Sequence, residues 1–62
     1  MDEDLESRFH RIYSNIPMGI RRDIIAVIDN EPMSWSVCSL EIRNHTALGK
    51  RILEYLNRLK II

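Results

Sequence analysis

The sequence TALGKRILEYLNRLK, residues 46–60, carries the most regular apolar pattern in the chain. Its large apolar residues recur at spacings that place them on one face of a helix with 3.6 residues per turn: Leu48, Ile52, Tyr55, Leu56 and Leu59. Thr46 suits the N-cap position, because its hydroxyl can accept a hydrogen bond from a free N–H of the first turn. We therefore predict an amphipathic helix over residues 46–60 with a largely basic outer face, formed by Lys50, Arg51, Glu54, Asn57 and Arg58.

A second amphipathic helix is predicted over residues 2–14. The same spacing is repeated there by Leu5, Phe9, Ile12, Tyr13 and Ile16. Acidic residues in the first turn suit the positive end of the helix dipole: Asp2, Glu3 and Asp4. Pro17 ends the helix, since the residue before a proline is disfavoured in the α conformation.

A third helix is predicted from residue 18 or 20 to residue 29. The stretch IIAVI, residues 24–28, is wholly apolar, which is typical of a segment enclosed by its neighbours, and we expect it to be the central helix. Pro32 follows closely, and proline lacks the N–H that a helix would need to continue.

Residues 33–45, MSWSVCSLEIRNH, fit two interpretations. As a helix capped by Ser34, this segment would have two apolar faces, one with Trp35, Cys38 and Ile42 and one with Val37 and Leu40. As a strand, it would alternate apolar and polar residues over positions 38–43. A lone strand needs a partner, so we favour a helix over residues 34–43 and an all-α domain of three to four helices with helix-turn-helix-like order. The alternative is an α+β fold with one strand at residues 35–43 paired across a dimer.

Length and composition describe one small globular domain over residues 1–62. No apolar run approaches the roughly 20 residues needed to cross a bilayer, and the acidic N-terminus lacks a secretion signal, so we expect a cytoplasmic protein. The net charge is zero but unevenly spread, with −4 over residues 1–6, zero over residues 7–42 and +4 over residues 43–62. A positive C-terminal part is compatible with an anionic partner, and equally with attraction between two copies of the chain.

The stretch RDIIAVIDNEPMSWSVCSLEIRNHTALGKRILEYLNRLKII, residues 22–62, resembles the helix-turn-helix core of small winged-helix regulators, without the wing. In that family a helix ending in a Glu-Pro turn leads through a Ser or Thr cap into a short helix, a turn and a longer recognition helix. The matching positions would be residues 24–28 for the first helix, residues 31–34 for the lead-in, Cys38 and Ile42 in the short helix, and Leu48, Ile52 and Tyr55 in the recognition helix.

The resemblance implies a small DNA-binding transcription regulator whose last helix enters the major groove, with basic side chains on phosphates and base edges. The residues expected at that nucleic-acid interface are Arg43, His45, Thr46, Lys50, Arg51, Asn57 and Arg58. Arg51 is the best candidate for a base contact, whereas Lys50 is expected on phosphate. The alternative is an ordinary solvated helix face.

A second functional class is a helical protein-protein interaction module or homodimeric adaptor. Its interface would use apolar residues outside the helical stripes: Trp35, Leu53, Ile61 and Ile62. Homodimerisation would enlarge the small core of so short a chain, and we therefore expect a homodimer. We expect no enzyme activity, metal or cofactor, because Cys38 fits a core position, Glu6 and His10 supply only two metal ligands, and the glycines are isolated.

Overall fold

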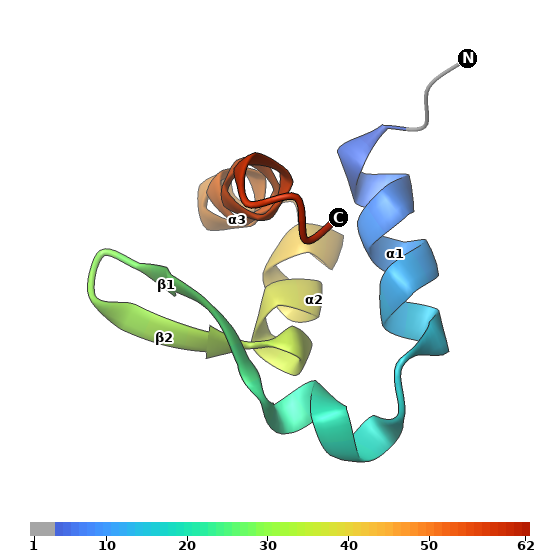
Figure 1. Ribbon diagram of the computed structural model, residues 1–62. Helices are drawn as coiled ribbons and strands as arrows, with labels where there is room; N and C mark the ends of the chain where they lie inside the picture. Colours follow the sequence, from blue (N-terminus) through green and yellow to red (C-terminus); the bar gives the residue numbers. More distant parts are fainter. Residues whose placement is uncertain (1–3) are drawn as a thin grey trace.

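The computed structural model describes residues 4–62, and Figure 1 shows how its helices and its β-hairpin are arranged. Along the chain come α1 (Leu5–Asn15), the 3-10 helix η1 (Met18–Arg22), β1 (Ile24–Ile28), β2 (Glu31–Ser34), α2 (Trp35–Arg43) and α3 (Ala47–Arg58). The two strands form an antiparallel sheet, so the fold is α+β. The prediction of an all-α domain is wrong, and so is the alternative of a strand at residues 35–43.

The error lies in residues 18–29, where the predicted central helix is replaced by η1 and β1. Four of the five residues of β1 are β-branched, which favours a strand. Asp29 and Asn30 have φ angles of 54° and 67°, the backbone of a type I′ turn, whose twist matches that of two antiparallel strands. Asp29 and Asn30 therefore connect two strands, and the prediction of a helix that ends at residue 29 is wrong.

The register of the hairpin allows β2 to contain Pro32, which has no N–H to donate. Ile28 pairs with Glu31 next to the turn, and Val27 then pairs with Pro32. Since pairs in an antiparallel ladder alternate between hydrogen-bonded and non-hydrogen-bonded, Pro32 falls where the ladder requires no N–H. The hairpin buries Ala26, Ile28 and Met33, while the side chain of Val27 is exposed.

The predicted helix over residues 34–43 is confirmed as α2. The Ser34 hydroxyl accepts a hydrogen bond from the Val37 N–H at 3.2 Å, as an N-cap should. The two apolar faces are also found, because Trp35, Cys38 and Ile42 are buried whereas Val37 and Leu40 are exposed.

The two amphipathic helices are confirmed as α1 and α3. Asp4 caps α1 by accepting from the Ser7 N–H at 2.7 Å, and this hydrogen bond lowers the pKa of the Asp4 carboxyl. The predicted start of α1 at residues 2 and 3 lies outside the described residues. Leu59, expected on the apolar stripe of α3, is 52% exposed because the helix ends at Arg58.

One hydrophobic core draws on every strand and α-helix and on the C-terminal residue. It consists of Phe9, Ala26, Ile28, Met33, Trp35, Cys38, Ile42, Ile52, Leu56 and Ile62. The centroid of the Phe9 ring lies 5.8 Å from the centroids of both the Tyr13 and the Trp35 rings. The contact between Phe9 and Trp35 joins α1 to α2. Arg8 Nη2 donates to the Ile62 carbonyl at 2.7 Å, which fixes residue 62 against α1.

Candidate functional site

The turn between α2 and α3 sets the position of the predicted nucleic-acid face. His45 has a φ of 55°, and its N–H donates to the Ile42 carbonyl at 3.1 Å, while the Thr46 N–H donates to the Glu41 carbonyl at 3.3 Å. This pair of hydrogen bonds closes the end of α2 as a Schellman motif, with a histidine in the left-handed position usually taken by glycine. The chain consequently reverses within three residues, and α3 starts directly beside the end of α2.

Thr46 joins the two helices through its hydroxyl. Its Oγ1 accepts from the Gly49 N–H at 2.9 Å and donates to Glu41 Oε1 at 2.7 Å. The hydroxyl is therefore committed to the N-cap of α3 and to the last turn of α2. Thr46 supports the proposed interface and does not offer a free group to a ligand.

Gly49 permits the close approach of α3 to α2. A Cβ atom at this position would lie 2.5 Å from the Glu41 carbonyl oxygen, which is part of the α2 backbone. A side chain of any size would push the two helices apart. Gly49 and the Thr46 cap together fix the angle at which α3 presents its outer face.

The remaining predicted nucleic-acid residues lie on the surface. The structure exposes Arg43, His45, Lys50, Arg51, Asn57 and Arg58. On α3, at 100° per residue, Lys50 and Asn57 fall on one side of the outer face and Arg51 and Arg58 on the other. Glu54 falls between the two sides and is exposed as well, so the basic face has a carboxylate in its middle.

Arg51 forms a bidentate ion pair with Asp29 at the tip of the hairpin. Arg51 Nη1 lies 2.7 Å from Asp29 Oδ2, and Nη2 lies 2.9 Å from Oδ1. The hydrogen bonds from Arg51 lower the pKa of Asp29, and those to Asp29 raise the pKa of Arg51. Both side chains remain more than half exposed, so the pair contributes little to stability. Sequence reasoning missed Asp29, because a helix in place of β1 gives no reason to expect residue 29 beside residue 51.

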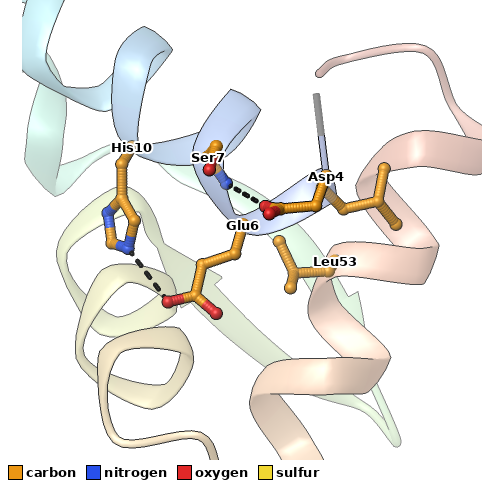
Figure 2. A pocket seen from close by; sticks show the side chains of 6 residues that line it. Asp4, Glu6, Ser7, His10 and Leu53 are labelled. Carbon is orange, nitrogen blue, oxygen red and sulfur yellow. Dashed lines mark hydrogen bonds and ion pairs between the residues drawn. The ribbon is translucent and has the colours of Figure 1, made fainter. Parts of the chain in front are cut away.

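A second cluster of polar side chains consists of Glu6 and His10 on α1 and His45 in the turn before α3. Glu6 Oε2 is 3.2 Å from His45 Nε2 and 3.6 Å from His10 Nε2. Figure 2 shows Glu6 and His10 on one face of α1, with Leu53 of α3 opposite. These three residues help to line an open hollow of about 540 Å³. The sequence indicates that Glu6 and His10 are one helical turn apart, but only the fold adds His45. The cluster ties α1 to the turn that precedes α3.

The residues predicted for a protein interface are divided between core and surface. Trp35 and Ile62 are each 8% exposed and belong to the core. Leu53 is half-buried and Ile61 is 37% exposed, so these two are the members of the predicted set that a partner could reach. Cys38 is buried, and burial raises the pKa of its thiol to about 11, which keeps it protonated and unreactive near neutral pH.

Comparison of the chain with protein-family models, with curated proteins and with solved structures gives no match. Within residues 4–62 no helix combines the length and apolar character needed to span a membrane. In the same residues no three His, Cys, Asp or Glu side chains come together as a metal site. The fold and its surface define a small α+β domain in which two helices, joined by a three-residue turn, expose a partly basic face.

Proposed function

We propose that this protein binds nucleic acid through the outer face of α3 and the α2–α3 turn, as a small helix-turn-helix-like regulator. The observation that carries the proposal is the arrangement of α2 and α3, in which a tight turn and Gly49 hold α3 against α2 with its polar face outward. A helix presented in this way can enter the major groove, and its exposed cations can neutralise phosphates.

The side chains available for contact have different roles. Lys50 is in the first turns of α3 and exposed, so it suits a phosphate or a base edge near the start of a recognition helix. Arg43 precedes the turn and Arg58 closes α3, which spreads the positive charge along the length of the face. Because Glu54 lies among them and Asp29 holds Arg51, few cations are free, and we expect modest affinity with a measurable salt dependence.

A salt titration tests this function. Binding of the full chain to a fluorescein-labelled 20-base-pair duplex should be measured by anisotropy between ~50 and ~200 mM salt, over which about three neutralised phosphates predict a roughly 40-fold loss of affinity. Lys50→Gln and Arg58→Gln should each weaken binding and reduce the salt slope by about one.

Arg11→Gln is the matched control, because Arg11 is an exposed cation of α1 that belongs to neither the outer face of α3 nor the α2–α3 turn. It should leave the affinity within about twofold of wild type, since the long-range field is screened over about 10 Å at 0.1 M salt. Absence of binding at low salt would end the proposal. Equal losses from Lys50→Gln and Arg11→Gln would also reject it, because they would indicate nonspecific attraction to the whole surface.

A second candidate function is protein-protein interaction, favoured by the outer face of α2. Val37 and Leu40 are 44% and 54% exposed and lie one helical turn apart on that face. If this face mediates self-association, sedimentation of the wild type should show a dimer that Leu40→Asp converts to a monomer. A wild type that sediments as a monomer at about 100 μM would exclude homodimerisation with a Kd in the usual micromolar-or-tighter range of specific complexes.

A further inference from the structure

We propose that a hollow between α1, η1 and the start of α2 is an anion site for a phosphate group, separate from the nucleic-acid face. This hollow, of about 400 Å³, is lined by Tyr13, Met18, Gly19, Arg21, Arg22 and Ser36. Two of these six residues carry guanidinium groups and none carries a carboxylate. Five of the six lining residues lie in α1 and η1, within residues 7–22. This part of the chain has no acidic residue and has four arginines, Arg8, Arg11, Arg21 and Arg22. The nearest acidic residue along the chain, Asp23, does not line the hollow.

Arg21 is held in place before any ligand binds. Its Cζ lies 4.4 Å from the centre of the Tyr13 ring, and its Nη2 donates to the Tyr13 carbonyl at 3.2 Å. Its Nε is buried without a hydrogen-bond partner, so no carboxylate within the described residues neutralises that edge. A guanidinium has five N–H donors, and these contacts leave Nη1 for a ligand. Since the side chain is already ordered, binding loses less conformational entropy than it would with a free arginine.

The segment that carries both arginines is fixed to α2. Ser36 Oγ donates to the Arg21 carbonyl at 3.1 Å, and the Trp35 N–H donates to the Asp23 carbonyl at 3.2 Å. These bonds bring η1 to the first turn of α2, where the helix dipole adds a partial positive charge. The two guanidinium groups and this helix end therefore favour an anion at the same place.

The geometry points to a phosphate group and not to an aromatic base. The Tyr13 ring already contacts Arg21 and stacks on Phe9 at 5.8 Å with an interplanar angle of 17°, so it offers little surface for a base to stack on. Guanidinium groups match the oxygens of a phosphate dianion by charge and by hydrogen-bond geometry. Met18 is 77% exposed, and a Cβ at Gly19 would meet no atom within 4 Å, so the rim is open.

The site lies at the opposite end of α2 from the proposed nucleic-acid face. Ser36 is in the first turn of α2, whereas the contact of Gly49 with Glu41 and Ile42 is in its last turns. Occupation of the hollow and binding of DNA to α3 are therefore separable by mutation, and the inference does not depend on the proposed function.

The test is a titration of the ¹⁵N-labelled full chain with inorganic phosphate at pH 7, at ionic strength held constant with sodium chloride. Saturable amide shifts are expected at Tyr13, Gly19 and Ser36. Arg22→Gln should weaken phosphate binding about fivefold or more, the effect of losing one charge-assisted contact of roughly 1 kcal/mol, while Arg58→Gln should change it less than about twofold. Arg21→Lys, which keeps the charge but loses the planar fork, should also weaken it.

Two further ligands define the chemistry. Acetate should bind more weakly than phosphate, and adenosine monophosphate should bind as phosphate does if the ligand is recognised by its phosphate group alone. Equal affinity for acetate and phosphate would overturn the assignment to phosphate. Shifts spread over all basic surfaces, or equal losses from Arg22→Gln and Arg58→Gln, would overturn the site itself. Because Arg22 is exposed, its variant should stay folded and keep the wild-type spectrum away from the hollow.

Discussion

Gly49 is the residue at which the backbones of α2 and α3 come closest. Gly49→Ala has two opposing effects on the free energy of unfolding. Alanine gains up to about 1 kcal/mol from its higher helix propensity. Its Cβ atom would also clash with the Glu41 carbonyl, and overpacking of this kind costs about 1–3 kcal/mol. Because the opposing atom belongs to a helix backbone, we expect a net destabilisation of about 1 kcal/mol, measured by urea unfolding. Gly19→Ala is the matched control, since its Cβ would meet nothing within 4 Å, and it should be neutral or slightly stabilising. An equal or greater stability of Gly49→Ala would contradict the close approach.

Cys38 gives the protein a predictable response to alkaline pH. Burial raises the pKa of its thiol from an ordinary value near 9 to about 11, so the thiol is neutral in the folded state. Below about pH 9 the thiol is protonated in both folded and unfolded chains, so its ionisation does not lower the free energy of unfolding. Between about pH 9 and pH 11 only the unfolded chain ionises, and stability falls as the pH rises.

The measurement is the free energy of unfolding of wild type and Cys38→Ala from pH 7 to pH 10.5. Comparing the two proteins removes the pH-dependent contributions of every group other than the thiol. The wild type should lose more stability than the variant over this interval. Parallel pH profiles would mean that the thiol is not shielded from water in the folded protein.

Among the secondary-structure elements, the helices could be predicted from the sequence and the hairpin could not. In α1 and α3 the apolar spacing and the capping residues Asp4 and Thr46 agree, so local pattern and tertiary packing give the same answer. In β1 the run of apolar residues has no period that separates a strand from a buried helix, and Ala26 adds to the ambiguity. The signals in favour of a strand were the β-branched residues and the pair Asp29-Asn30, because Asp and Asn tolerate the positive φ angles that a two-residue type I′ turn requires.

Asn30→Gly tests this hairpin turn. Asn30 has a φ of 67°, which glycine adopts without strain, so the substitution should stabilise the fold by a few tenths of a kcal/mol up to about 1 kcal/mol. The same substitution in α3, Asn57→Gly, should destabilise by about 0.5 kcal/mol, because glycine is a poor helix former. Thermal unfolding of the two variants should therefore shift in opposite directions. A loss of stability in both would indicate that residue 30 does not adopt the left-handed conformation.

Over the whole molecule, the candidate site was only partly predictable, because the chain fold brings opposite charges together. Charge alternates along the sequence, with −4 over residues 1–6, +4 over residues 7–22, −4 over residues 23–42 and +4 over residues 43–62. The basic face of α3 follows from the local sequence pattern, but the position of the acidic hairpin tip beside it depends on the fold. The contacts of Arg51 with Asp29 and of His45 with Glu6 both cross between segments of opposite charge. The positive potential of the α3 face is consequently lower than its sequence suggests.

Asp29→Asn measures how much the hairpin tip restrains the proposed nucleic-acid face. Asparagine tolerates the left-handed backbone of the turn and removes the charge that holds Arg51, while an exposed ion pair contributes little to folding. The variant should therefore fold as the wild type does. If phosphate competes with Asp29 for Arg51, its affinity for duplex DNA at about 50 mM salt should rise severalfold, with a steeper salt slope.

Glu31→Gln is the control for this prediction. Glu31 is an exposed carboxylate of the same hairpin, and within residues 4–62 Arg51 forms its ion pair with Asp29 and not with Glu31. The control removes an equal charge and should raise DNA affinity by a smaller factor, through the general field alone. Equal gains from the two variants would mean that release of Arg51 adds nothing. A lower affinity of Asp29→Asn than of wild type would mean that Asp29 orients Arg51 for binding, since a bidentate carboxylate holds the guanidinium plane in one direction.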